Sequence, residues 1–165
     1  IQEGGRRAGT ENLIGIIGMG KAAELAFKDM ERRQAHIKRL KQRLIKGLEE
    51  GIEDIIINGH PEQSLPNLVS VSIKYIEGES IVLMLEDEDI TVSTKSACAS
   101  GSLRASHVLL SIGCEYADAQ GTLVISFGQE TKEDEIDKFL YALKKVVKTI
   151  REISPLYKRE KNKNY

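Results

Sequence analysis

The chain has 165 residues, which is about one domain's worth at ~100–200 residues per domain, and 41% of them are hydrophobic. The 24 Lys and Arg residues nearly balance the 25 Asp and Glu residues, and this balance excludes a general attraction to nucleic acid or to an anionic membrane. No apolar run approaches the ~20 residues of a membrane-spanning helix. We therefore expect one compact, soluble unit.

The two cysteines, Cys98 and Cys114, form neither a CxxC pair nor a Cys/His metal spacing. A disulfide framework and a structural zinc site are therefore not indicated, and a reducing cytoplasm fits best. The chain opens on IQEGGRRAGT, which lacks an initiator Met and reads as the middle of a Gly-rich loop. We expect a fragment of a longer protein.

The first fifty residues predict two helices. One begins at Glu11 with Thr10 as its N-cap, and the other follows Asp29 and ends at Gly51. Apolar residues recur with helical spacing in both, at Leu13, Ile16, Ile17, Ala23 and Leu25 and then at Ile37, Leu40, Leu44 and Leu48. The Lys and Arg residues between them are most simply a solvated helix face.

The middle of the chain predicts short strands and helices in alternation. Residues 68–75 alternate apolar and polar side chains, which is typical of a half-buried strand. Three more strands are expected at 54–59, 90–94 and 121–128, and helices at 78–89 and 106–113, the last with Gly113 as its C-cap.

The last element is a long amphipathic helix before Pro155. Thr131 and Asp134 resemble a capping box, and one apolar stripe follows it: Ile136, Phe139, Leu140, Leu143, Val146, Val147 and Ile150. We expect residues 158–165 to be a disordered tail. The order of elements indicates an α+β domain, with a small mixed or antiparallel sheet and helices packed mainly on one side.

The stretch STKSACASGSLRASHVLLSIG, residues 93–113, surrounds Cys98 with small residues. A thiol is a nucleophile only as thiolate, so a reactive cysteine needs access and a nearby cation or helix N-terminus. Lys95 and Arg104 are candidate cations. Composition alone leaves Cys98 open between an inert small residue and an exposed nucleophile, whereas Cys114 at a helix end favours packing.

The histidines His36, His60 and His107 do not pair with carboxylates at a spacing that suggests a catalytic triad. A Cys-His hydrolase is therefore weakly supported, and His107 is more simply structural than catalytic.

Residues 2–26, 58–113 and 121–140 together resemble the C-terminal part of cysteine desulfurases, and RAGTEN and SACASGSL are the most specific segments. These enzymes use pyridoxal 5'-phosphate and belong to the class V aminotransferase group, fold type I. The resemblance runs in order from about Gln2 to Tyr157. It implies that residues 1–157 are the small, C-terminal domain, and that the domain with the cofactor-bearing Lys in a Ser-x-His-Lys segment lies outside this sequence.

The resemblance also implies a mechanism and site residues. L-cysteine would be bound by pyridoxal phosphate, which stabilises the carbanion at Cα. Cys98 matches the loop cysteine that takes the substrate sulfur as a persulfide, leaves alanine, and passes the sulfur to an acceptor such as an iron–sulfur scaffold protein. No resident metal is implied, although Cys98 is a candidate transient ligand to an iron–sulfur cluster on the scaffold.

Thr10 matches the Thr of the family's R-x-G-T segment, which hydrogen-bonds the cofactor phosphate in the other protomer's active site. The resemblance therefore implies a homodimer with Thr10 as a cofactor-binding residue, and an isolated fragment that does not turn over. A hydroxyl at a Gly-rich helix start is also a reasonable phosphate ligand on physical grounds.

Several positions depart from the family pattern, and two of them bear on the proposed chemistry. Val124 stands where many members have the Arg that holds the substrate carboxylate, and Lys95 stands where Gly is usual in the cysteine loop. Two alternatives follow: a selenocysteine lyase or related class V lyase that needs Cys98 less, and a non-catalytic module that carries sulfur or binds a scaffold.

Overall fold

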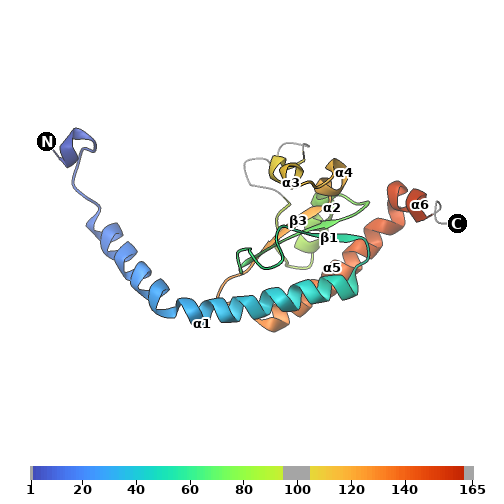
Figure 1. The fold of residues 1–165 in the computed structure, drawn as a ribbon, viewed down its shortest axis with the longest axis horizontal. Coiled ribbons are helices and arrows are strands. Elements are labelled where there is room, and N and C mark those ends of the chain that lie inside the picture. The colour runs from blue at the N-terminus through green and yellow to red at the C-terminus, as the bar shows by residue number, and fades with distance from the viewer. Residues whose placement is uncertain (1, 95–104, 162–165) are drawn as a thin grey trace. The chain divides into compact units, whose positions relative to one another are not determined.

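The computed structural model describes residues 2–94 and 105–161 (Figure 1). The chain divides into two compact units, residues 1–35 and 36–165, rather than the single unit that its length predicts. The first contains a short 3-10 helix, η1 (Glu3–Gly5), and the beginning of α1 (Leu13–Gly51), while the second contains the end of α1 and every later element. The assignment of residues 1–157 to one domain of a larger enzyme stays a prediction.

Helix α1 is continuous where the sequence predicted two helices. The stretch from Ala26 to His36 contains neither Gly nor Pro. Across the expected break, the carboxylate of Asp29 pairs with Arg32 at 2.7 Å and with Arg33 at 3.9 Å, at the spacings that stabilise a helix. The N-cap prediction was wrong, because the side chain of Asn12, and not that of Thr10, accepts the N–H of Gly15 at 3.0 Å.

Three strands form an antiparallel sheet in chain order: β1 (Ile55–Asn58), β2 (Leu68–Ile73) and β3 (Thr122–Ser126). In the register of β2, Ile73 lies opposite Ile55 of β1, and Val71 lies between Ile57 of β1 and Leu123 of β3. This confirms the expected small sheet of an α+β fold. Of the two expected forms, mixed and antiparallel, the sheet has the antiparallel form.

One face of the sheet packs against the long helices. Side chains alternate along β2, so Val69, Val71 and Ile73 point into the core and Ser70 and Ser72 point to the other face. The core is completed by the second part of α1, by α2 (Gly78–Glu86) and by α5 (Glu133–Ile153), through the buried side chains of Leu40, Leu44, Leu48, Ile81, Leu85, Ile136, Phe139, Leu143, Val146 and Val147.

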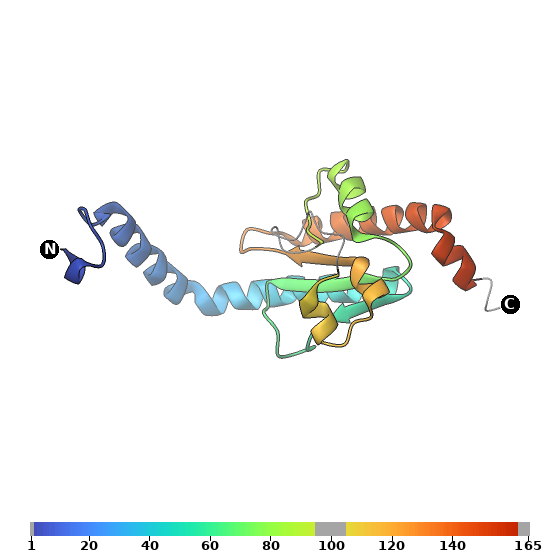
Figure 2. The ribbon, with the colours of Figure 1, turned by 90° about the horizontal axis from the view of Figure 1, so that it is seen from above.

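Two five-residue helices, α3 (His107–Ser111) and α4 (Tyr116–Gln120), lie on the opposite side of the strands from α5 (Figures 1 and 2). The expectation of helices mainly on one side is confirmed, because the long helices share one face. The sequence predicted α3 but not α4.

The segment 90–94 does not form the predicted strand. Within the described part of the chain it makes a single bridge, in which Ser93 donates to the carbonyl of Val124 at 3.2 Å and accepts from its N–H at 2.6 Å. The capping box at α5 also differs from the prediction, since Glu135 accepts the N–H of Lys132 at 2.8 Å while Thr131 accepts the N–H of Gly128 at 3.2 Å.

A further helix, α6 (Pro155–Lys161), follows α5 directly and covers the first four residues of the expected tail. Its start has a clear cause. Ser154 accepts the N–H of Tyr157 at 3.3 Å and donates to the carbonyl of Tyr75 at 2.7 Å, and Pro is favoured at the first position of a helix because its missing N–H would have no partner there. Pro155 therefore begins α6 just after the end of α5.

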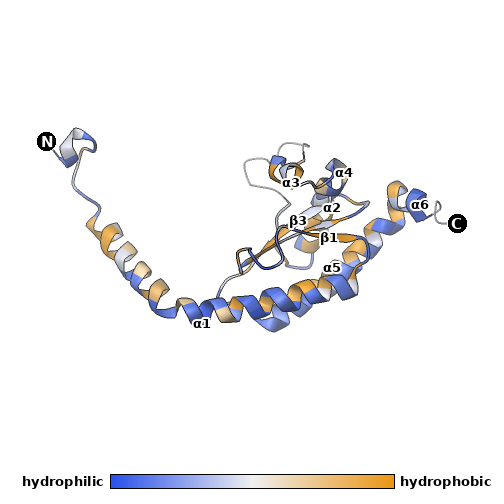
Figure 3. Ribbon diagram, viewed as in Figure 1, coloured by the Kyte–Doolittle hydropathy of each residue, from blue (hydrophilic) through white to orange (hydrophobic). Residues whose placement is uncertain are grey.

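The first turns of α1 are apolar and exposed (Figure 3). Ile14 is 87% and Phe27 is 80% exposed, and none of the described residues from 2 to 35 is buried. A helix that is apolar on all sides is usually covered in the functional protein.

Gly121 should be irreplaceable for steric reasons, because a β-carbon there would clash with the backbone carbonyls of Ile73 and Ile76. We expect Gly121→Ala to lower the free energy of unfolding by about 1–3 kcal/mol. Gly128, just beyond the other end of β3, has open space around it, so Gly128→Ala should stay within about 0.5 kcal/mol of the parent. Urea unfolding followed by circular dichroism measures both, and equal effects would contradict the packing argument.

Candidate functional site

The two residues that the sequence predicts for the site fall in different parts of the chain. Cys98, together with Lys95 and Arg104, lies outside the described residues. Thr10 is described and belongs to the first unit, whereas the segments that flank the cysteine stretch belong to the second. The roles of Cys98 and Thr10 therefore remain predictions, which the geometry around each can support only in part.

Thr10 is exposed on the short connection between η1 and α1. Gly9 before it has a φ of +86°, a left-handed conformation that favours glycine. The carbonyl of Thr10 accepts a hydrogen bond from Arg7 at 3.3 Å, which leaves the hydroxyl out of this contact. An accessible hydroxyl just ahead of a helix start suits a phosphate group.

The cysteine stretch is entered from the edge of β3. The paired N–H and carbonyl groups of Ser93 and Val124 hold the chain there. The next residue, Thr94, has its methyl group so close to Gly78 that a β-carbon on Gly78 would lie 3.0 Å from it and 2.9 Å from the carbonyl of Thr122. Only glycine at the start of α2 allows this close packing.

Beyond the stretch, Ser106 precedes α3, and α3 is attached to the second unit by Leu109, which is 8% exposed. The N–H of Cys114 donates to the carbonyl of Leu109 at 3.0 Å. Both ends of the segment that contains Cys98 are therefore held, one by β3 and the other by α3.

Val124 lies on the polar face of the sheet, opposite Ser70 in the register, and is half-buried. A valine cannot donate a hydrogen bond, so this position offers no clamp for a carboxylate. Because Val124 also pairs with Ser93, the position of the expected Arg is adjacent to the entry of the cysteine stretch.

A buried polar cluster on this face was missed by the sequence analysis. Ser72 is 0% and Thr122 is 1% exposed, and their hydroxyl oxygens are 2.7 Å apart. The amide of Asn58 donates to Ser72 at 2.9 Å, and the sulfur of half-buried Cys114 lies 3.9 Å from the Ser72 hydroxyl. The alternation of polar residues in β2 was the available signal, but it predicts only a half-buried strand and not the burial of Ser72.

An ion pair fastens α4 to the end of β2. Lys74 and Asp118 are 3.2 Å apart, and the Asp118 side chain is 11% exposed. The hydrogen bond to Asp118 raises the pKa of Lys74 above its ordinary value of 10.5, against the opposing effect of burial.

Two of the histidines have structural contacts. His36 Nε2 donates to the carbonyl of Thr131 at 2.9 Å, and His60 Nδ1 accepts the N–H groups of Glu62 and Gln63 at 3.1 and 2.9 Å. His107 begins α3. Within residues 2–94 and 105–161, no group of three or more His, Cys, Asp or Glu side chains could hold a metal ion, and no helix has the length and apolar content to cross a membrane.

Comparison with known proteins gives consistent similarities. Residues 2–139 match the model of the family described as aminotransferase class-V. The chain is 44% identical over 158 residues to cysteine desulfurase IscS 1 of Archaeoglobus fulgidus, covering 96% of this chain and 41% of the relative. It is 47% identical over 158 residues to cysteine desulfurase IscS of Clostridium botulinum, covering 94% of this chain and 40% of the relative.

Solved structures agree in fold. A NifS-like protein matches with a TM-score of 0.75 and 31% identity, over 90% of this chain and 37% of its own. A NifS-like protein from Rickettsia africae also gives a TM-score of 0.75, at 26% identity, over 88% of this chain and 37% of its own. The chain thus spans about 40% of the length of the curated relatives it matches.

The ion pair between Lys74 and Asp118 predicts a pH-dependent contribution to stability. Asp118→Asn should lower the free energy of unfolding by about 1 kcal/mol at neutral pH. Because the folded-state pKa of Lys74 is raised, the contribution is fully present below about pH 10.5 and is lost as the pH rises through the folded-state pKa. The difference between parent and variant should therefore be constant from neutral pH upward and narrow only in strong alkali.

Urea unfolding at a series of pH values measures this difference. Asp87→Asn, which changes an exposed carboxylate at the end of α2, is the matched control and should show no such dependence. A difference between parent and variant that stays constant even in strong alkali would rule out the ion pair as its source.

Proposed function

This chain belongs to the aminotransferase class-V family, and on that premise we propose that it is the C-terminal part of a cysteine desulfurase, which converts L-cysteine to L-alanine and holds the released sulfur as a persulfide on Cys98. The observation that carries the proposal is identity of 44–47% to proteins named cysteine desulfurase over 94–96% of this chain. The fold likeness to NifS-like proteins supports it independently of the sequence motifs.

Cys98 is the sulfur acceptor in this proposal. Its thiolate forms an S–S bond to the substrate sulfur while the C–S bond of the substrate breaks, and the substrate carbon takes a proton to leave as L-alanine. The described residues on either side of the cysteine stretch are held in the second unit, Ser93 by its bridge to β3 and α3 by the buried Leu109.

Pyridoxal 5'-phosphate is the cofactor in the proposed enzyme, and when bound it supplies an electron sink for the charge that develops at the substrate Cα. The residues present fit its phosphate group, because Thr10 offers an exposed hydroxyl after a left-handed glycine and ahead of α1. None of the lysines of this sequence stands in a Ser-x-His-Lys segment, so the lysine that anchors the cofactor comes from outside these 165 residues.

The proposed enzyme is a cytoplasmic homodimer in which Thr10 of one protomer binds the phosphate in the other's active site. The persulfide on Cys98 is then passed to an acceptor such as an iron–sulfur scaffold protein. These assignments are carried by the resemblance of RAGTEN and SACASGSL to the desulfurase segments.

Val124 favours one second candidate, a non-catalytic sulfur carrier. The residue offers no donor to a substrate carboxylate and lies at the entry of the cysteine stretch. Such a carrier would become persulfidated only when a separate desulfurase supplies the sulfur, and it would release no alanine of its own.

The two cysteines provide a matched pair of variants in the full-length polypeptide. Cys98→Ser should lower alanine and sulfide formation from L-cysteine by at least ~1,000-fold, because it removes the nucleophile. Cys114→Ser should retain activity, since Cys114 contacts Ser72 and the carbonyl of Glu115. Amino-acid analysis measures alanine, and intact mass reports the persulfide.

Full activity in Cys98→Ser would refute the persulfide mechanism and favour a lyase that does not need this cysteine. Persulfide on Cys98 that requires an added desulfurase, with no alanine formed, would replace the proposal with the sulfur carrier.

Thr10→Val should weaken cofactor affinity of the full-length polypeptide by roughly 10-fold or more, the usual effect of losing a hydrogen bond to a charged group. Thr10→Ser, which keeps the hydroxyl, should bind normally. Thr149→Val is the control, because its exposed hydroxyl donates to the carbonyl of Lys145 on α5. Absorbance titration with pyridoxal phosphate measures the affinities, and unchanged binding in Thr10→Val would remove Thr10 from the site.

A further inference from the structure

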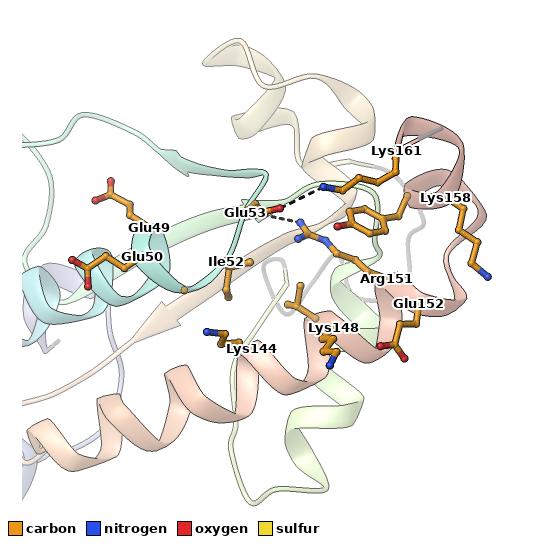
Figure 4. Close-up of a pocket in the computed structure, with 13 residues that line it drawn as sticks. Glu49, Glu50, Ile52, Glu53, Lys144, Lys148, Arg151, Glu152, Lys158 and Lys161 are labelled. Carbon is orange, nitrogen blue, oxygen red and sulfur yellow. Dashed lines mark hydrogen bonds and ion pairs between the residues drawn. The ribbon is translucent and has the colours of Figure 1, made fainter. Parts of the chain in front are cut away.

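A groove lies in the second unit between the end of α1 and the facing turns of α5 and α6 (Figure 4). Its walls include Gly51, Ile52, Val147, Lys148, Arg151 and Tyr157. All of the residues that line it belong to the second unit. We call it the Arg151 groove.

Arg151 is an unusual residue to find in such a wall. It is only 7% exposed, although the guanidinium group stays charged in proteins. Its Nη2 donates to the carbonyl of Glu53 at 2.8 Å, and the group lies 5.0 Å from the centre of the Tyr157 ring. Among the described residues it forms no ion pair with a carboxylate, and its buried Nε has no hydrogen-bond partner.

A buried cation is costly unless an anion accompanies it. The nearby acidic side chains do not supply one. Glu53 pairs through Oε2 with Lys161 at 3.5 Å. The other three carboxylates that line the groove, those of Glu49, Glu50 and Glu152, point away from Arg151 (Figure 4). Within the part of the chain that the structure describes, no carboxylate therefore compensates the charge of Arg151 beside the open groove.

The other walls define what could accompany the charge. Ile52 and Val147 are 6% and 3% exposed and form an apolar floor, and Tyr157 contributes an aromatic ring. Lys144 and Lys148 extend along α5 at the groove, and their aliphatic stems add apolar surface below the charged ends. The combination suits a ligand with an apolar body and a single acidic group.

We propose that the Arg151 groove binds a small organic carboxylate, whose acid group pairs with Arg151 and whose apolar body lies against Ile52, Val147 and Tyr157. The carboxylate supplies the counter-charge that the described residues do not provide. The proposal rests on residues of α1, α5 and α6 to which the proposed function gives no role, so it holds whether or not the chain is part of a desulfurase.

The test compares 3-phenylpropionate with 3-phenylpropanol, which has the same apolar body without the charge. Calorimetric titration of the full-length polypeptide should give a dissociation constant on the order of 1 mM for the acid, the range of a fragment-sized ligand. The acid should bind at least ~10-fold more tightly than the alcohol. Arg151→Met should abolish this preference while retaining an apolar side chain of similar length.

Arg43→Met is the matched control, because Arg43 pairs with Asp137 at 2.7 Å and is not part of the groove. It should keep the preference for the acid. Methyl NMR of the parent protein gives a readout that needs no variant: the Val147 and Ile52 methyl signals should shift on addition of the acid, with saturation.

Equal binding of acid and alcohol, tight binding of the acid by a folded Arg151→Met, or saturation without shifts at Val147 and Ile52 would each overturn the proposal. If Arg151→Met does not fold, the comparison of acid with alcohol and the methyl shifts in the parent protein decide the question.

Discussion

The packing of one apolar sheet face against α1 and α5 is the interaction on which the second unit depends. Val69, Val71 and Ile73 of β2 alternate into this core, and Leu40, Leu44 and Leu48 meet them from α1. Because that face packs in the core, Ser72 and Thr122 lie on the opposite face. Helices α3 and α4 cover this opposite face (Figures 1 and 2). The edge of β3 is then free to hold Ser93, where the cysteine stretch begins. The place at which the chain enters the cysteine stretch thus follows from the burial of hydrophobic side chains elsewhere in the sheet.

The fold could be predicted from the sequence where buried side chains recur at a regular spacing. The α5 stripe and the alternation of β2 were predicted because each residue's environment follows from its neighbours at fixed spacing. The wrong predictions concern the starts of helices, where a single hydrogen bond determines which residue begins the helix. Asn12 rather than Thr10 caps α1, Glu135 rather than Asp134 accepts at the start of α5, and Ser154 with Pro155 begins a new helix. The full burial of Ser72 depends on Asn58, Thr122 and the α3–α4 segment, which are distant in the sequence.

The candidate site was predictable only through the resemblance of two motifs. Composition left the role of Cys98 undecided, and no spacing rule connects it to Thr10, because Thr10 and the segments that flank the cysteine stretch lie in separate compact units. The geometry adds the anchors of the cysteine stretch and the surroundings of Val124. Arg151 illustrates the opposite case, since nothing in its sequence context distinguishes it from the other cations of α5. It is distinguished by being buried without a carboxylate partner among the described residues.

The exposed apolar turns of α1 affect how easily the hydrogen bonds of this helix open locally under heat or denaturant. Helical hydrogen bonds between residues 13 and 35 have no buried side chains to protect them, whereas those beyond Leu40 are backed by the sheet. A single continuous helix would therefore contain two segments of unequal protection against amide hydrogen exchange. Its early amides would exchange by local fraying, and those near Leu44 only when the whole second unit opens.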